Sequence, residues 1–257
     1  MPSRACSLLV ISALALLLSA CGDSKATVAT PKTTPVMPAE TVLVSAYFIS
    51  GGKLAATGRK TVHTLAVGQA SIGALLNGPS SAEKKLGFST ALPANTELRK
   101  ITKNGGRLTV ALSTSLGKAA RAQVVTTLTQ FTSVREVVIG TPSGRTRPLN
   151  RANFEALMPA VLIESPLPLA RVKSPLRVAG SSNTFEATSQ LELLDAHGKL
   201  LAAKTVSASS GSGTRGTFSV SLRFRARAGL ATLVSFENSA KDGSRISTVR
   251  IPVRISG

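Results

Sequence analysis

The sequence has few of the residues that bind metals, form disulfides or stack on bases. Its 257 residues include two Cys, two His, one Tyr and no Trp, and aromatic residues make up only 4%. Structural zinc sites and disulfide scaffolds need more Cys and His, and base-stacking surfaces need more aromatics. The composition therefore argues against all three classes of protein.

Acidic residues are also scarce. Twelve Asp and Glu stand against 31 Lys and Arg, which gives a formal net charge of +19. The excess is spread along the chain: residues 40–147 hold 14 basic and 4 acidic side chains, and residues 148–257 hold 14 and 7. A nucleic-acid arm concentrates its charge in a block, so no nucleic-acid partner is predicted. The 43% of apolar residues is enough for a packed core.

Residues 1–20 have the pattern of a bacterial secretion signal. Arg4 supplies a positive start, and the apolar run from Leu8 to Leu18 is shorter than the ~20 residues of a membrane-spanning helix. The run ends in Leu18-Ser19-Ala20-Cys21, which resembles the lipobox of bacterial lipoproteins. The resemblance implies that Cys21 carries diacylglycerol, that membrane lipid is a partner, and that the protein is held on the extracellular face of the cell membrane.

Residues 21–41 are rich in Thr and Pro and show no hydrophobic period. Prolines favour extended chain, at ~3 Å per residue. We interpret the segment as a tether between the anchor and the folded part.

The stretch 42–147 predicts an α+β domain, a small sheet with two helices. The glycines after Ser50 and after Asn104 mark turns between pairs of apolar runs. Helical spacing of apolar residues and a Gly-Pro stop predict the helices. The expected strands are 42–49, 54–62, 98–102, 108–112 and 134–139, and the expected helices are 67–77 and 118–131. The second helix is rich in Val and Thr, so tertiary packing must support it.

Several motifs in this stretch resemble the GerMN domain of sporulation and germination proteins. They are Ala74-Leu75-Leu76-Asn77-Gly78-Pro79, Gly87, Ala91-Leu92-Pro93 with Thr96 and Leu98, the run from Gln123 to Phe131, and the strand around Val137. These residues cap helices and mark turns, and the resemblance implies no catalytic residue.

The stretch 160–257 predicts an all-β domain, an immunoglobulin-like sandwich. Apolar and polar residues alternate over 217–225 and 249–255, as in strands with one buried face. Further short strands are expected at 175–179, 185–194, 199–206 and 230–236, and Pro252 suits an edge strand or a bulge. Residues 148–159, basic and interrupted by proline, are the predicted linker between the two domains.

This half resembles the immunoglobulin-like domain of bacterial spore germination proteins. The residues that carry the resemblance are Glu164-Ser165-Pro166-Leu167-Pro168, Ser174-Pro175-Leu176, Gly180, Phe185-Glu186-Ala187, Asp195, Gly198, Gly216, Phe218, Ser239-Ala240 and Asp242-Gly243-Ser244. Together the two resemblances imply an envelope lipoprotein of a Gram-positive lineage.

A search for catalytic or metal-binding groups finds no set that belongs together. His63 and His197 lie in different halves, and His197 stands in a predicted turn. Asp195 and Asp242 each precede a turn glycine and are expected to cap turns rather than bind calcium. Glu186 is a candidate buried or interface carboxylate without a partner acid. We therefore predict no catalytic residue, no metal and no cofactor.

Clustered arginines are the candidate anion-binding residues. Arg223, Arg225 and Arg227 are expected on one strand face, and Arg250 and Arg254 on another. Arg145, Arg147 and Arg151 form a further basic group near the linker. These groups would meet anionic phospholipid or anionic wall polymer, or remain a solvated basic surface.

The sequence thus predicts a membrane-anchored envelope lipoprotein that is a non-catalytic interaction or assembly module rather than an enzyme. Its partner would be another envelope protein, and self-association into a homo-oligomer stays open. The alternative function is salt-sensitive binding of wall polymer or membrane surface. A third hypothesis, an envelope hydrolase, requires paired carboxylates or a nucleophile and base in one cleft.

Overall fold

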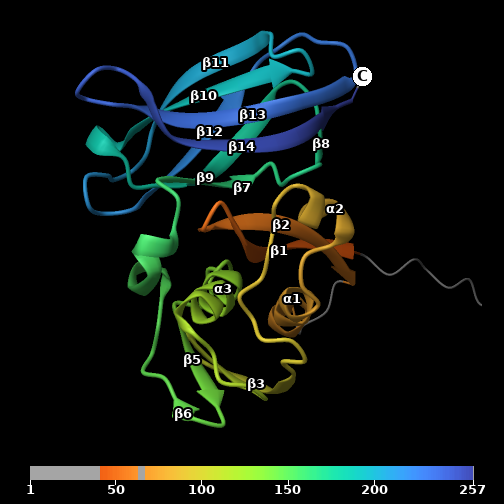
Figure 1. Ribbon diagram of the computed structural model, residues 1–257, viewed down its shortest axis with the longest axis vertical. Helices are drawn as coiled ribbons and strands as arrows, with labels where there is room; N and C mark the ends of the chain where they lie inside the picture. Colours follow the sequence, from red (N-terminus) through yellow and green to blue (C-terminus); the bar gives the residue numbers. More distant parts are fainter. Residues whose placement is uncertain (1–40, 63–66, 257) are drawn as a thin grey trace, which may run out of the picture. The chain divides into compact units, whose positions relative to one another are not determined.

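The computed structural model describes residues 41–62 and 67–256, which belong to one compact unit. The signal sequence, the lipobox with Cys21, the tether up to residue 40, and His63 lie outside the described residues. Two modules follow each other along the chain, and we call residues 41–150 the N-terminal module and residues 160–256 the C-terminal module (Figure 1).

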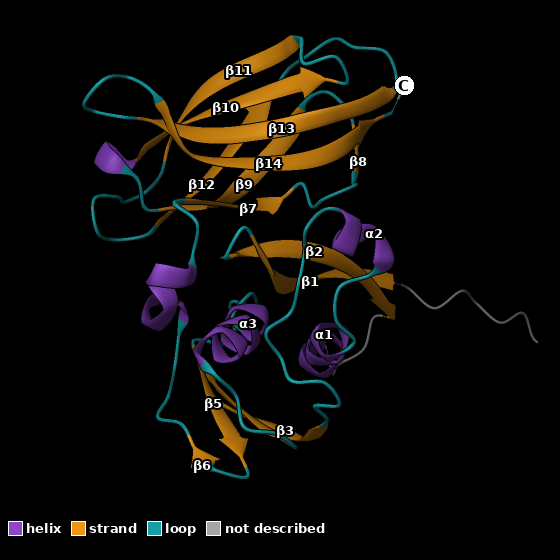
Figure 2. Cartoon of the chain, in the orientation of Figure 1, coloured by secondary structure: helices purple, strands orange, loops and turns teal. Residues whose placement is uncertain are grey.

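The N-terminal module is a layered α+β structure, as predicted (Figure 2). A two-stranded hairpin, β1–β2, and a four-stranded sheet of order β3-β4-β5-β6 enclose α1 and α3 between them. Its elements are β1 Thr41–Ser50, β2 Lys53–Val62, α1 Val67–Leu76, α2 Ser81–Lys85, β3 Leu98–Asn104, β4 Arg107–Leu112, α3 Lys118–Leu128, β5 Glu136–Thr141 and β6 Gly144–Arg145. The β4–β5 pair is parallel and the other pairs are antiparallel.

Helix α3 forms the centre of this module. From Ala122 to Leu128 every residue is buried, because the helix packs against β1 on one side and β5 on the other. This burial explains how a helix rich in Val and Thr is stable despite weak intrinsic propensity. The helix is shorter than the predicted 118–131: it ends at Leu128, and the side chain of Gln130 bonds to Ser45 on β1 instead.

Two small elements of the N-terminal module were not predicted. Helix α2 begins with a capping box, in which Ser80 accepts from the Glu83 amide and the Glu83 carboxylate accepts from the Ser80 amide. Ser80 and Glu83 have the spacing of that motif, so the signal was present in the sequence. The two-residue β6 has no hydrophobic pattern and only its pairing with β5 defines it.

The C-terminal module is an all-β sandwich, as predicted. One sheet has the order β11-β10-β13-β14-β8 and the other β12-β9-β7, with only β14–β8 parallel. The strands are β7 Val161–Ser165, β8 Arg171–Val172, β9 Leu176–Ser182, β10 Thr188–Asp195, β11 Leu200–Ser207, β12 Gly216–Leu222, β13 Gly229–Asn238 and β14 Arg245–Ile255. The alternating residues of β12 and β14 that were predicted to be apolar and inward do line the core between the sheets.

The strand predicted over 185–194 begins later than expected. Phe185–Ala187 is a 3₁₀ turn, η2, and only Thr188–Asp195 is strand. The backbone turns here because it bonds to a neighbouring loop: the Glu186 amide donates to Ser212 Oγ at 3.1 Å, and Glu186 has a φ of 52°. Glu186 is exposed, so the prediction of a buried carboxylate is wrong, and the alternative of an interface carboxylate stays a prediction.

The strand predicted over 217–225 ends early, at Leu222. Leu222 pairs with Leu176, the first residue of β9, and Pro175 before it has no N–H to continue the ladder. Arg223, Arg225 and Arg227 therefore lie on the connection between β12 and β13 rather than on a strand face, although all three are exposed.

Candidate functional site

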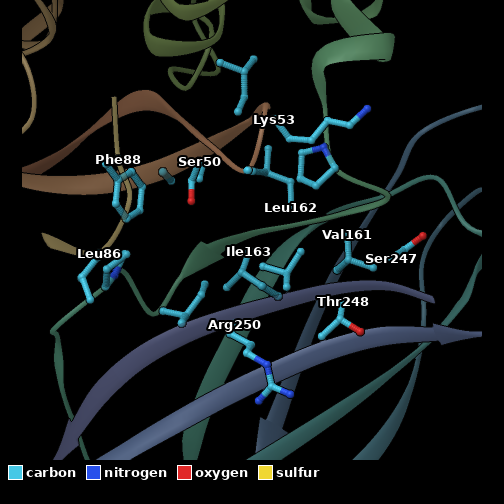
Figure 3. A pocket seen from close by; sticks show the side chains of 18 of the residues that line it. Ser50, Lys53, Leu86, Phe88, Val161, Leu162, Ile163, Ser247, Thr248 and Arg250 are labelled. Carbon is cyan, nitrogen blue, oxygen red and sulfur yellow. The ribbon is translucent and has the colours of Figure 1, made fainter. Parts of the chain in front are cut away.

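A cavity of about 740 Å³ lies where the β1–β2 turn, the segment after α2, strand β7 and strand β14 meet (Figure 3). We call it the groove. Ser50 and Lys53 come from the hairpin, and Leu162 from β7. Residues 247–252 of β14 complete the lining. Both modules therefore contribute to the groove.

One edge of β14 is unpaired where it lines the groove. On its outer side β14 pairs only with the two residues of β8, at Arg254 and Ile255. The Pro252 carbonyl accepts from the Leu169 amide at 2.7 Å, and the Arg254 amide donates to Ala170. These bonds show that the N–H and C=O groups of the even-numbered residues of β14 point away from β13. The N–H and C=O of Arg250 therefore face the side of β14 that has no partner strand.

Two features shorten this free edge. A bulge shifts the β13–β14 register between Ser235 and Glu237, and opposite it Ser247 has a φ of 54°. Pro252 ends the run on the other side, which agrees with the expectation that it suits an edge strand. Bulges and prolines protect sheet edges from unselective pairing, so the open stretch between them is short and defined.

The chemical character of the groove suits binding. Its lining includes Lys53 and Arg250 as the charged side chains and no Asp, Glu, His or Cys. Lys53 Nζ donates to the Ala156 carbonyl at 2.9 Å. The groove and two further cavities within residues 41–62 and 67–256 have no pair of carboxylates in their linings, and such a pair is one of the two arrangements that the hydrolase hypothesis allows.

A charged cluster around Arg151 holds together the two modules that form the groove. Arg151 Nη1 donates to Glu164 Oε1 on β7 at 2.7 Å, and Nη2 donates to Tyr47 Oη on β1 at 3.2 Å. The Tyr47 hydroxyl also donates to Glu164. Arg151 belongs to η1, a 3₁₀ segment over Arg151–Leu157 within the predicted linker, so it is not part of the basic surface in which the sequence placed it.

The protonation states of this cluster follow from its surroundings. Burial raises the pKa of the Tyr47 hydroxyl well above its ordinary value, so Tyr47 keeps its proton. Burial alone would lower the pKa of Arg151, but Tyr47 and Glu164 raise it by more, so Arg151 stays charged. The cluster thus holds a neutral hydroxyl and an ion pair that the two modules share.

A second cluster holds the other end of η1. Arg215 Nη2 donates to Glu155 Oε1 at 2.9 Å and to the Pro159 carbonyl at 2.6 Å. Asn183 Nδ2 donates to the same carboxylate. Burial raises the pKa of Glu155, but hydrogen bonds from Arg215 and Asn183 lower it by more, so the net pKa lies below its ordinary value.

Apolar packing also crosses between the modules. Leu162 and Leu167 belong to the same buried cluster as the core of the N-terminal module. Leu167 approaches Gly58 on β2 so closely that a Cβ on Gly58 would lie 2.9 Å from Leu167 Cδ1. The sequence offered no signal for this contact, because it joins residues more than a hundred positions apart.

The other predicted site residues are dispersed over the surface. Arg250 lines the groove, and Arg254 pairs in register with Arg171 on β8. Arg223, Arg225 and Arg227 contact neither the groove lining nor an acid in an ion pair within the described residues.

The predicted turn residues are where the sequence placed them. Asp195 Oδ1 accepts from the His197 and Lys199 amides, and Asp242 Oδ1 accepts from the Ser244 amide. The amides of Lys199 and His197 lower the pKa of the Asp195 carboxyl, and the hydroxyl and then the amide of Ser244 lower the pKa of the Asp242 carboxyl. Both aspartates thus cap turns, as expected.

Within residues 41–62 and 67–256 there is no group of three or more His, Cys, Asp or Glu placed to hold a metal ion. No helix among these residues is long and apolar enough to span a membrane.

The two modules define a class of protein, an α+β domain followed by an immunoglobulin-like sandwich. Residues 45–140 match the family model described as sporulation and spore germination, and residues 160–244 match the immunoglobulin-like domain of bacterial spore germination. Each module is thus similar to one of these two families.

The chain is also similar to several solved structures. The first GerMN domain of the sporulation protein GerM from Bacillus subtilis is 23% identical, with 41% of this chain and 86% of that chain covered and a TM-score of 0.35. The tandem GerMN domains of the same protein are 14% identical, with 72% and 62% covered and a TM-score of 0.37.

CopC from Methylosinus trichosporium OB3b is 15% identical to this chain, with 37% of this chain and 92% of that chain covered and a TM-score of 0.26. No curated protein sequence matches the chain significantly.

Proposed function

We propose that the protein is a non-catalytic assembly module of the cell envelope, anchored through lipid on Cys21, that holds an extended segment of a partner protein in the groove. The observation that carries this function is the short unpaired edge of β14 inside a cavity formed by both modules. Addition of a strand to an exposed sheet edge is a common mode of peptide recognition. Main-chain hydrogen bonds supply the affinity and the cavity walls supply the selectivity.

The charges of the groove indicate the chemistry of the partner segment. Lys53 and Arg250 are its charged lining residues, and no acid of the lining offsets them. An extended segment with acidic side chains complements this lining. The ion pair of Arg151 with Glu164 keeps the hairpin and β7 at a fixed separation, so the partner meets a preformed site.

The groove is tested by two substitutions at one position. Arg250→Pro removes the outward N–H together with the charge, whereas Arg250→Ala removes the charge and keeps the N–H. Proline is tolerated where the N–H faces away from the sheet, so both variants should fold, and circular dichroism checks this. A photoreactive residue at Ser50 in the native host then identifies the partner segment by crosslinking and mass spectrometry.

We expect a peptide of the crosslinked partner sequence to bind the Arg250→Pro variant about tenfold more weakly than the Arg250→Ala variant. The factor corresponds to one main-chain hydrogen bond of about 1.4 kcal/mol. Equal affinity of the two folded variants would show that the β14 edge does not pair with the partner. A crosslink to polymer or lipid alone would exclude a protein partner.

The anchor is tested separately. Replacement of Cys21 by Ser should abolish incorporation of a labelled fatty acid and move the protein from the membrane fraction to the medium. The same variant should still bind the partner peptide, because the groove lies in the described, folded residues. Failure of the unchanged protein to incorporate the labelled fatty acid would exclude lipid as the anchor.

A second candidate function is salt-sensitive binding of anionic wall polymer or membrane surface through exposed arginines. It is supported by the exposure of Arg223, Arg225 and Arg227 on one short connection without ion pairs in the described part of the chain. Joint replacement of the three by Gln should weaken binding to the polymer at low salt and leave folding intact. Unchanged binding by this variant would exclude the role of this connection.

A further inference from the structure

A separate cavity of about 310 Å³ lies beside the β5–β6 hairpin of the N-terminal module. Three arginines line it, Arg121 from α3 and Arg145 and Arg147 from the hairpin and the segment after it. The hydroxyl-bearing residues Thr141 and Ser143 line it as well. We call this cavity the arginine pocket.

The charge of this pocket is uncompensated. Its lining includes no carboxylate, and none of the three arginines is in an ion pair within residues 41–62 and 67–256. Elsewhere the structure pairs arginines with acids: Arg59, Arg107, Arg151, Arg215 and Arg245 each contact a glutamate within 3 Å. Three unpaired guanidinium groups around one cavity favour an anionic ligand.

Local structure holds the pocket in shape. Arg121 Nε donates to the Leu116 carbonyl at 2.9 Å, which fixes the position of its guanidinium. Arg145 is held opposite Gly140 by the short β5–β6 ladder. The Thr146 hydroxyl accepts from the Ile139 amide at 3.0 Å, so its hydrogen stays available to donate. A ligand that enters the pocket thus meets positioned donors.

We propose that the arginine pocket binds a phosphodiester group of a polyol-phosphate polymer of the cell wall. Arginine guanidinium groups pair with phosphate oxygens, and the Thr and Ser hydroxyls match the hydroxyls of a polyol chain. This function lies on a different surface from the groove and from Arg223, Arg225 and Arg227. It does not depend on a protein partner in the groove.

A polymer fits the pocket better than a bilayer surface does. Amphipathic segments that bind to membrane surfaces insert apolar side chains beside their basic residues. The exposed large apolar residues of the described chain all lie outside the pocket lining; they are Leu43, Leu86, Leu169, Phe185, Leu200, Leu230 and Ile246. A concave pocket lined by arginines and hydroxyls is suited to a single phosphate of a chain that passes over it.

The test compares variants of equal charge. The full lipidated chain in neutral detergent is titrated with poly(glycerol phosphate), with inorganic phosphate and with phosphatidylglycerol vesicles, at low and high salt. One variant carries Arg121, Arg145 and Arg147 replaced by Gln. Its matched control carries Arg99, Lys100 and Lys103 of β3 replaced by Gln, which removes the same charge from another exposed surface. Because Arg121 also bonds to Leu116, the double variant Arg145→Gln with Arg147→Gln is measured too.

We expect the pocket variant to bind poly(glycerol phosphate) at least 30-fold more weakly than the unchanged protein, and the double variant about tenfold more weakly. The control variant should bind poly(glycerol phosphate) less than threefold more weakly than the unchanged protein. Equal losses in pocket variant and control would show diffuse charge attraction and overturn the proposal. It is likewise overturned if only the control loses affinity, if vesicles bind and the polymer does not, or if the unchanged protein binds neither.

Discussion

Two glutamine side chains, Gln123 in α3 and Gln130 just after it, bond to main-chain groups of β1 as a neighbouring strand would. Gln123 Oε1 accepts from the Ala91 amide at 2.7 Å and its Nε2 donates to the Tyr47 carbonyl at 2.9 Å. Gln130 bonds to both the N–H and the C=O of Ser45. Main-chain groups of β1 that would otherwise be buried without partners are thereby satisfied. This role explains why polar residues occupy a buried helix.

Replacement of Gln123 by Leu should lower the free energy of unfolding by about 2 to 4 kcal/mol. The buried Tyr47 carbonyl loses its partner, which costs about 1–3 kcal/mol, and the Ala91 amide loses a hydrogen bond that contributes about 1 kcal/mol. Urea unfolding followed by circular dichroism measures the change. Gln69→Leu is the matched control, because Gln69 is an exposed residue of α1, and it should change the free energy by less than about 0.5 kcal/mol. Similar losses in both variants would contradict the strand-like role of Gln123.

Glu83 should make stability depend on pH. Burial raises the pKa of this carboxyl, but hydrogen bonds from Arg59 and Ser80 lower it by more, and the net pKa lies below the ordinary 4.5. A carboxyl with a lowered pKa in the folded state stabilises the protein above its unfolded-state pKa, and the stabilisation is lost as pH falls through the folded-state value. The free energy of unfolding should therefore fall below about pH 4.5.

The variant Glu83→Gln separates the contribution of Glu83 to this pH dependence from the contributions of the other acidic residues. It should be less stable than the unchanged protein at pH 7, and the difference should shrink towards pH 3, because the unfolded chain takes up a proton at Glu83 below about pH 4.5. Urea unfolding at the two pH values measures both quantities. A difference that is the same at pH 3 and pH 7 would mean that the charge of Glu83 does not stabilise the fold.

At the scale of elements, two glycines have opposite roles. Gly73 lies within α1, and a Cβ added there meets no atom within 4 Å. Gly180 lies in β9, and a Cβ added there would lie 2.0 Å from the Leu162 carbonyl oxygen on β7. The first glycine weakens its helix without a packing reason, whereas the second allows two strands to approach.

The two alanine variants should therefore shift the unfolding midpoint in opposite directions. Gly73→Ala should stabilise the protein by about 0.5–1 kcal/mol, because alanine favours the helix more than glycine does. Gly180→Ala should destabilise it by at least about 1–3 kcal/mol, because a main-chain carbonyl must move. Thermal unfolding of the two variants side by side measures the shifts, and a shift of the same sign in both would contradict this assignment.

Much of each element could be predicted from local pattern. The hairpin turns, the C-cap at Gly78 and the alternating strands depend on neighbours in the sequence, and the structure has them in place. The element bounds that were predicted wrongly depend on contacts between distant parts of the chain. β12 ends at Leu222 because its partner begins after Pro175, and η2 turns because Ser212 accepts its bond. No pattern within either segment carries that information.

At the scale of the whole molecule, the shared core predicts joint unfolding of the two modules. Leu162 and Leu167 complete the apolar cluster of the N-terminal module, and Arg151 ties Tyr47 to Glu164 across the junction. Neither module buries these groups alone. We therefore expect one calorimetric transition for the described part of the chain.

Arg151→Ala should split this transition into two. It removes the ion pair and leaves Glu164 and Tyr47 without their common partner, while both cores remain otherwise intact. Arg99→Ala is the control, because Arg99 is exposed on β3 and in no ion pair of the described residues, and it should keep a single transition. Two transitions in the unchanged protein would show that the junction does not couple the modules.

The sequence by itself determined the order and class of the two modules, the turns that join their strands, and the family resemblance, because these depend on periodicity and on short motifs. It also determined the candidate anchor at Cys21 and the strong positive charge. Which arginines are available depends on the three-dimensional packing. Arg151, Arg59 and Arg215 are bound to glutamates 13, 24 and 60 residues away in the chain, whereas Arg121, Arg145 and Arg147 line one cavity. The groove, too, exists only in three dimensions, because its walls come from strands separated by some two hundred residues of chain.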